Sequence, residues 1–165
     1  MNQDKEELIE LFGIHFENRY LIPPLAARIL AVLIIEGCKT GLTFDYLLEK
    51  MQASKSSIST NLNLLLKTEH IHYYTQAGDR KKYFKAAPLS QRLNNYLSLL
   101  NNEKILIEKI INFRKQNNPC ELEKVNLQNS IAYQEHILQI EQVLMNTIEK
   151  FKMIENNNIA NHSNS

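Results

Sequence analysis

The stretch from Gly41 to Ala86 constrains the fold of this 165-residue chain more than any other. It begins with two short helical patterns and ends with two strand-like runs around Ala77-Gly78-Asp79. In the first helical pattern Thr43 is a favourable N-cap, and apolar residues recur every three or four positions, at Phe44, Leu47, Leu48 and Met51. Gln52-Ala53 forms the predicted turn to the second pattern. The stretch therefore predicts two short helices followed by a hairpin.

The second helical pattern has one apolar face and one polar face. Ser54 is its predicted N-cap, and its buried stripe consists of Ile58, Leu62, Leu65 and Leu66. At about 100° per residue, the opposite face carries Ser56, Thr60, Asn63 and Lys67, with Lys55, Ser57, Ser59 and Asn61 beside it. Short hydroxyl and amide side chains approach base edges and phosphates closely. A merely solvated face is the alternative, but Ser, Thr and Asn are poor helix formers, so we favour a binding role.

Two runs rich in β-forming residues follow, at positions 71–75 and 82–86. Gly78 is able to take a positive φ in the turn between them, and Arg80, Lys81 and Lys82 stand near the tip. Lysines also protect edge strands, which is the alternative explanation for this charge. However, the net charge is −3 over residues 1–53, +5 over 54–99 and −1 over 100–165. Positive charge gathered on one helix and one hairpin suits a phosphate backbone.

Helix, turn, helix and hairpin in this order predict a winged helix-turn-helix, mainly α-helical with a small β-hairpin as the wing. In this arrangement the second helix enters a DNA major groove. The expected DNA contacts of that helix are Ser54, Lys55, Ser56, Ser57, Ser59, Thr60, Asn63 and Lys67. The expected contacts of the wing are Asp79, Arg80, Lys81 and Lys82.

Residues 42–86 resemble the DNA-binding core of the GbsR-type branch of the MarR family of bacterial transcriptional regulators. In this resemblance, Ser54-Lys55-Ser56-Ser57-Ile58-Ser59 corresponds to the capped recognition helix and Gly78-Asp79-Arg80-Lys81-Lys82-Tyr83 to the wing. Strong similarity covers about residues 20–88 and implies a DNA-binding regulator, with choline as an effector of some members. The chain departs from the family pattern at Gln52, where Gly often closes the first helix. It departs again at Lys81, where Arg is common, which leaves open which basic residue Asp79 orients.

Further helices flank this core. Residues 3–20 form a predicted amphipathic helix, and Leu25 to Glu36 form a second one that is apolar nearly all round and therefore buried. Two long helices follow Pro88, at 89–116 and about 122–154, the first with a near-heptad seam that Lys104 interrupts. Their apolar surface exceeds what a small domain covers, so we predict a homodimer, with an intramolecular helical hairpin as the alternative. The predicted dimerisation residues are Leu8, Phe12, Leu100, Ile107, Ile111, Leu144, Ile148 and Phe151.

The predicted organisation is a dimerisation helix at 1–22, a DNA-binding domain at 23–88, long dimerisation helices at 89–155 and a polar, disordered tail at 156–165. No apolar run approaches the ~20 residues that span a bilayer, and the polar, acidic start is unlike a signal peptide, so we expect a cytoplasmic protein. Aromatic side chains at helical spacing, such as Phe12, Phe16, Tyr20 and Tyr96, are interpreted as core rather than as a cage for a quaternary ammonium effector.

The sequence offers no catalytic or metal-binding pattern. With only 4 glycines it has no phosphate-binding loop, and its histidines and its two cysteines, Cys38 and Cys120, follow no metal or redox spacing. We therefore expect no enzyme activity, no cofactor and no metal. The leading hypothesis is a homodimeric transcriptional regulator, a repressor, that binds an inverted repeat in double-stranded DNA, with an effector that the sequence does not identify. The alternative is a winged-helix adaptor whose basic wing binds an acidic protein.

Overall fold

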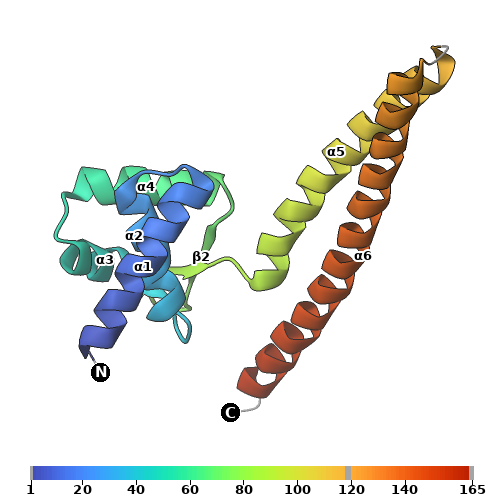
Figure 1. Ribbon diagram of the computed structural model, residues 1–165. Helices are drawn as coiled ribbons and strands as arrows, with labels where there is room; N and C mark the ends of the chain where they lie inside the picture. The colour runs from blue at the N-terminus through green and yellow to red at the C-terminus, as the bar shows by residue number, and fades with distance from the viewer. Residues whose placement is uncertain (1, 118–119, 164–165) are drawn as a thin grey trace. The chain divides into compact units, whose positions relative to one another are not determined.

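The computed structural model describes residues 2–117 and 120–163. The elements in chain order are α1 (Asn2–Tyr20), α2 (Pro24–Ile35), β1 (Leu42–Thr43), α3 (Phe44–Met51), α4 (Lys55–Lys67), β2 (Ile71–Thr75), β3 (Lys82–Ala86), α5 (Leu89–Gln116) and α6 (Glu121–Ser163) (Figure 1). They divide into two compact units, Met1–Ala87 and Pro88–Ser165. The chain is thus mainly α-helical with one small antiparallel sheet, as the sequence predicts.

Helix α2 forms the centre of the first unit. It is buried nearly all round because almost every residue in it is apolar, and Ala27, Ile29 and Leu30 are at most 1% exposed. Helix α1 packs along α2 through Ile9 and Phe16, so α1 belongs to the same unit as α3, α4 and the β2–β3 hairpin. The predicted boundary between 1–22 and 23–88 is therefore corrected, because the apolar face of α1 covers α2.

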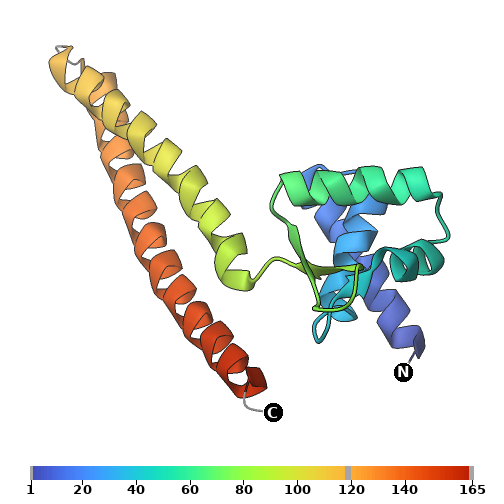
Figure 2. The same cartoon turned by 180° about the vertical axis from the view of Figure 1, so that it is seen from behind.

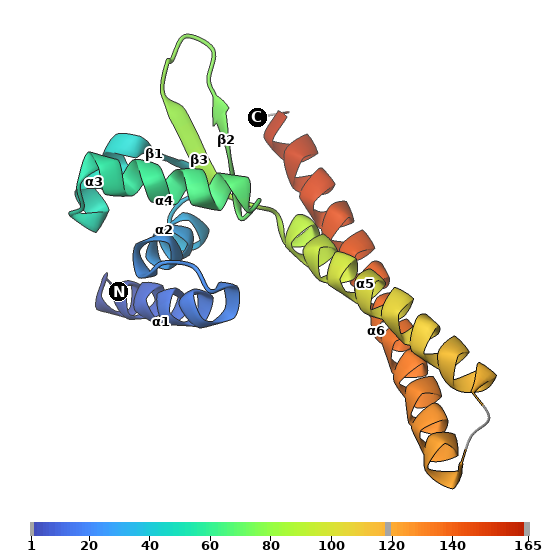
Figure 3. The same cartoon turned by 90° about the horizontal axis from the view of Figure 1, so that it is seen from above.

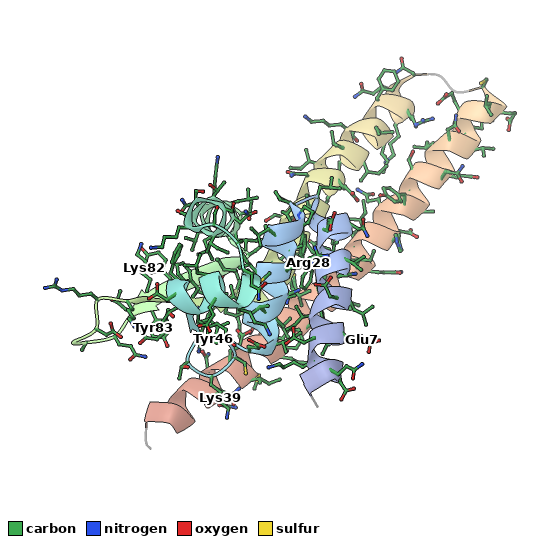
Figure 4. All side chains as sticks on the ribbon, turned by 90° about the vertical axis from the view of Figure 1, so that its left-hand side faces the viewer. Glu7, Arg28, Lys39, Tyr46, Lys82 and Tyr83 are labelled. Carbon is green, nitrogen blue, oxygen red and sulfur yellow. The ribbon has the colours of Figure 1, made fainter. Side chains whose placement is uncertain are left out.

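Arg28 is the one charged residue inside α2, and it is paired across to α1. Its Nε and Nη2 atoms donate hydrogen bonds of 2.9 Å each to the two carboxylate oxygens of Glu10. Figure 4 shows Arg28 at the side of α2 that faces α1. A two-pronged arginine–carboxylate pair adds geometric specificity to the packing of the two helices.

A second polar cluster joins α1, the end of α2 and α3. The Glu36 side chain is only 6% exposed, and its Oε1 lies 2.8 Å from Lys5 Nζ and 3.2 Å from Lys50 Nζ. Its Oε2 accepts a hydrogen bond from the Tyr46 hydroxyl, while Lys50 also pairs with Glu6. Burial raises the pKa of Glu36, but the Lys5 and Lys50 ammonium groups and the Tyr46 hydroxyl outweigh it and hold the pKa below its ordinary value.

This cluster predicts a loss of stability in acid. Because the folded-state pKa of Glu36 lies below its ordinary value of 4.5, its contribution is fully present above about pH 4.5 and is lost as the pH falls through the lowered pKa. Replacing Glu36 with Gln should reduce the free energy of unfolding by about 1–3 kcal/mol at pH 7 and by less in acid. Urea unfolding of both proteins at pH 7, 5 and 3 measures this. A difference between them that stays constant with pH would contradict the assignment.

The sheet contains one strand more than the sequence predicts. The expected hairpin is present, with β2 and β3 antiparallel and Tyr74 opposite Tyr83. Strand β1 adds to the other edge of β3, with Leu42 opposite Phe84. Gly41 precedes it with a φ of +71°, and a Cβ there would lie 2.8 Å from the carbonyl oxygen of Phe84. Only glycine fits this close approach without a shift, which is why β1 begins where it does.

The second unit is an antiparallel pair of long helices, α5 and α6, which lie side by side in Figures 1 and 2. Ile107 and Ile111 of α5 are buried with Ile137 of α6 in one apolar cluster. Lys104, which interrupts the apolar seam of α5, pairs with a residue of α6. Its Nζ atom donates a hydrogen bond to Glu141 Oε2 at 2.9 Å. The chain therefore forms the intramolecular helical hairpin that the sequence left as an alternative.

This hairpin corrects part of the predicted dimerisation surface. Ile107, Ile111 and Ile148 are 7%, 4% and 3% exposed in the single chain, so they are not free for a partner. Three other apolar side chains of α5, spaced seven residues apart, are left largely exposed: Leu99 at 63%, Leu106 at 59% and Phe113 at 66%. Periodicity identified α5 as apolar, but it did not distinguish which stripe α6 covers.

The predicted tail is also corrected. Helix α6 continues beyond residue 154 to Ser163, because no proline or glycine follows Pro119 to end it. Residues 164 and 165 of that tail lie outside the described residues.

Candidate nucleic-acid interface

The turn between α3 and α4 follows from local capping. The Thr43 Oγ1 atom accepts the backbone N–H of Tyr46 at 3.3 Å at the start of α3, and the Ser54 Oγ atom accepts that of Ser57 at 3.1 Å at the start of α4. Between them Gln52 takes the left-handed conformation with a φ of 50°. Two N-caps and one left-handed residue thus fix the angle at which α4 leaves α3.

The N-terminal end of α4 carries a cluster of hydroxyl groups. The Ser54 Oγ atom lies 3.0 Å from Ser56 Oγ and 2.8 Å from Ser57 Oγ. Ser54, Lys55 and Ser56 are exposed and Ser57 is half-buried. The free N–H groups and the dipole at a helix start favour negative charge, so this end of α4 suits a phosphate oxygen or an acceptor on a base.

The outer face of α4 is polar, as the sequence predicts. Ile58, Leu62 and Leu65 are buried on its inner face. The exposed side chains opposite are Ser59, Thr60, Asn63 and Lys67. Asn61 instead donates to the backbone carbonyl of Ser57 at 2.8 Å, and Leu64 is half-buried against the core. The face that remains available to a ligand is therefore made of short polar groups with one lysine.

The β2–β3 hairpin projects away from helices α1 to α4, as Figure 3 shows. Its loop carries the exposed side chains of Arg80 and Lys81. Lys82 begins β3, and its ammonium group lies 4.1 Å from the centre of the Tyr73 ring. This cation–π contact fixes Lys82 at the base of the loop, whereas Arg80 and Lys81 extend from the tip.

A groove of about 320 Å³ lies between α4 and the hairpin. Ser59 and Asn63 of α4 and Lys82 of β3 provide its polar groups, and Phe44, Leu62, Leu66 and Phe84 its apolar lining. The structure thus brings residues of the predicted recognition helix and of the predicted wing to one surface, although they are about twenty positions apart in the sequence.

Asp79 is the one acidic residue among the predicted wing contacts. Its Oδ1 accepts the backbone N–H of Lys81 at 2.9 Å, and its Oδ2 accepts the Tyr83 hydroxyl at 2.7 Å. These two donors, the amide first, hold the pKa of Asp79 below its ordinary value. The same contact raises the pKa of Tyr83, so its hydroxyl remains a donor at neutral pH.

Sequence reasoning missed the part that the tyrosines play in this surface. From the sequence, Tyr73 and Tyr74 were expected only as strand-forming residues, and Tyr83 only as a strand-forming residue that is also the last of the wing segment. The sequence does contain a signal for these contacts, because the position of the turn determines which residues of the two strands are neighbours. This position brings the tyrosines next to one another and to Lys82 and Lys85 across the hairpin.

Within the described parts of the chain, no three His, Cys, Asp or Glu side chains converge on a site that would hold a metal ion. None of the described helices combines the length and the apolar character needed to cross a membrane. Helices α3 and α4 with the hairpin after them define a winged helix-turn-helix protein.

Comparison with known proteins points the same way. No protein-family model matches the chain. It is 34% identical over 85 residues to the HTH-type transcriptional regulator MmpR5 of Mycobacterium tuberculosis, covering 52% of this chain and 50% of that protein. The chain therefore spans about half the length of the curated relative it matches.

Among solved structures, one of a transcriptional regulator has a TM-score of 0.63 and 21% identity, covering 91% of this chain and 99% of that chain. This similarity supports the fold. A structure of the transcriptional regulator SlyA covers 90% of this chain and 92% of its own with 13% identity, but its TM-score of 0.39 is too low to support an argument. MmpR5 and the first of these structures are both described as transcriptional regulators.

Proposed function

We propose that this protein is a sequence-specific, DNA-binding transcriptional regulator of the MarR type, within the GbsR-type branch, that acts as a repressor. One observation carries the proposal: a capped helix with an exposed face of hydroxyl, amide and ammonium groups shares a groove with the basic hairpin beside it. The net charge of +5 over residues 54–99 is concentrated on these same elements. The similarity to MmpR5, a transcriptional regulator by name, supports the regulatory role.

In the proposed complex α4 enters the major groove. Ser56 and Thr60, in the N-terminal half of α4, meet bases or the adjacent phosphates, Asn63 meets the groove wall and Lys67 the backbone. Arg80 reaches the minor groove, where a narrow A·T tract strengthens the negative potential. Lys55, Lys81 and Lys82 contact phosphates and supply affinity without sequence preference.

The proposed active form is a homodimer. The apolar stripe of Leu99, Leu106 and Phe113 on α5 is exposed in the single chain, and a second copy would cover it. Leu8 of α1 is 43% exposed and Phe12 is half-buried, and both remain predicted contacts of the partner. Two copies related by a dyad would read an inverted repeat, with half-sites about one helical turn apart. The proposed cellular location is the cytoplasm, with a small-molecule effector still to be identified.

The first test is the salt dependence of binding to duplex DNA. Since several lysines and arginines are expected to contact phosphates, the affinity should fall by about 10³-fold or more between 50 and 200 mM salt. Fluorescence anisotropy with a labelled duplex measures this, and an acidic peptide of equal charge serves as the competitor. If the protein binds the acidic peptide more tightly than any duplex, it is an adaptor rather than a DNA-binding regulator.

A further inference from the structure

The position of Asp79 in the hairpin loop raises a question of charge. A carboxylate beside Arg80 and Lys81 would repel the phosphates that those side chains are proposed to meet. This repulsion is therefore expected to be outweighed by a structural role of the Asp79 side chain in the loop. The two oxygens of Asp79 accept hydrogen bonds from the Lys81 backbone N–H and from the Tyr83 hydroxyl, so the carboxylate joins the tip of the loop to the start of β3.

Tyr83 is itself anchored to the body of its unit. It lies directly opposite Tyr74 in the sheet, and the two rings stack with their centres 5.6 Å apart. The Tyr74 hydroxyl donates a hydrogen bond to the backbone carbonyl of Thr40, which precedes β1. A continuous series of contacts thus runs from the backbone at Thr40 through the two rings to Asp79 and the loop.

The backbone conformation of the loop depends on the same carboxylate. The Asp79 N–H donates to the carbonyl of Gln76 at 3.0 Å, which closes the turn around Gly78 with its φ of +83°. The side chain of Asp79 then fixes the next two residues by accepting the N–H of Lys81. Arg80 lies between these two points, so the direction of its side chain is set by how Asp79 is held.

From this geometry we propose that Tyr83 is a positioning residue for DNA binding. Its hydroxyl holds the Asp79 carboxylate, and the carboxylate fixes the loop so that Arg80 and Lys81 face the DNA. The inference rests on the proposed DNA-binding function. In this arrangement Asp79 orients the backbone of the loop rather than one particular basic side chain.

The test compares Tyr83→Phe, Asp79→Asn and the double variant in the full chain. Tyr83→Phe removes the hydroxyl and keeps the stacked ring. We expect the affinity for a duplex selected with the wild-type protein to fall about five- to tenfold in each single variant. The double variant should bind no more weakly than Asp79→Asn alone, because the two residues act through one contact. The melting temperature should remain that of the wild type.

The matched control is Tyr133→Phe, which removes a tyrosine hydroxyl bonded at 3.1 Å to the carboxylate of Glu103, in the α5–α6 hairpin. Its DNA affinity should equal that of the wild type. A second readout follows the Asp79 carboxyl by NMR, and its pKa should move toward the ordinary value in Tyr83→Phe.

Wild-type affinity in Tyr83→Phe, effects of the two single changes that multiply in the double variant, or an unchanged Asp79 titration would each overturn the inference while leaving the proposed function intact. If the wild-type protein binds no duplex, the proposed function fails first and the role of Tyr83 fails with it.

Discussion

Replacing Arg80, Lys81 and Lys82 together with alanine should weaken DNA binding by about 100-fold or more. Arg80 alone is expected to contribute about 1–3 kcal/mol if it lies in the minor groove. The two lysines are expected to contact phosphates, so their loss should also flatten the dependence of log affinity on log salt by about two units for each copy bound. Anisotropy titrations of the triple variant at several salt concentrations measure both effects.

The control removes the same charge elsewhere. Lys109, Lys115 and Lys150 are exposed residues of α5 and α6, and their joint replacement with alanine should leave the affinity nearly unchanged. If the two triple variants bind equally well, only net charge matters and the hairpin is not a wing. Arg80→Ala tested alone distinguishes the role of Arg80 from that of the two lysines. It should reduce the preference for A·T-rich flanks, whereas the lysine changes should not.

Replacing Leu106 and Phe113 with aspartate should separate the proposed dimer into folded monomers. These side chains are 59% and 66% exposed in the single chain, so two carboxylates there disturb a partner more than the hairpin itself. Sedimentation should change from about twice 19.2 kDa to 19.2 kDa, while the helical signal in circular dichroism is kept. The DNA affinity should fall by about 100-fold or more because the two half-sites are no longer bound together.

Two comparisons make this result specific. Asn101→Asp with Asn112→Asp adds the same charge at exposed polar positions of α5 that lie away from this stripe, and it should leave the dimer intact. Ile107→Asp places a carboxylate in the buried cluster with Ile137 and should unfold the hairpin. A wild-type protein that sediments as a monomer, or a Leu106→Asp, Phe113→Asp variant that remains a dimer, would show that this stripe is not the interface.

The features that the sequence predicted well depend on neighbouring residues. The two helix starts and the turn between them depend on contacts within three or four positions, at Thr43, Gln52 and Ser54. The α3–α4 motif could therefore be predicted from the sequence. The polar face of α4 and the position of the hairpin were likewise predicted, because helical periodicity and turn chemistry are local properties.

The features that the sequence did not predict depend on tertiary contacts. Strand β1 has two residues, and it exists because Gly41 lets the backbone approach Phe84. The burial of Ile107 and Ile111 depends on which stripe of α5 meets α6, and periodicity cannot distinguish two adjacent stripes. The Asp79–Tyr83 contact becomes visible only when the register of the hairpin is known.

The central claim is that α4 reads DNA sequence as part of a symmetric dimer. Selection from randomised duplex oligonucleotides tests it directly, with the wild type, Thr60→Ala and Lys67→Ala run in parallel. The wild type should recover an inverted repeat whose half-sites lie about 10 bp apart. Thr60→Ala should change base preference at symmetric positions by about 1 kcal/mol or more in each half-site, whereas Lys67→Ala should lower affinity and keep the motif. A motif without dyad symmetry, or the same motif from Thr60→Ala as from the wild type, would contradict the claim.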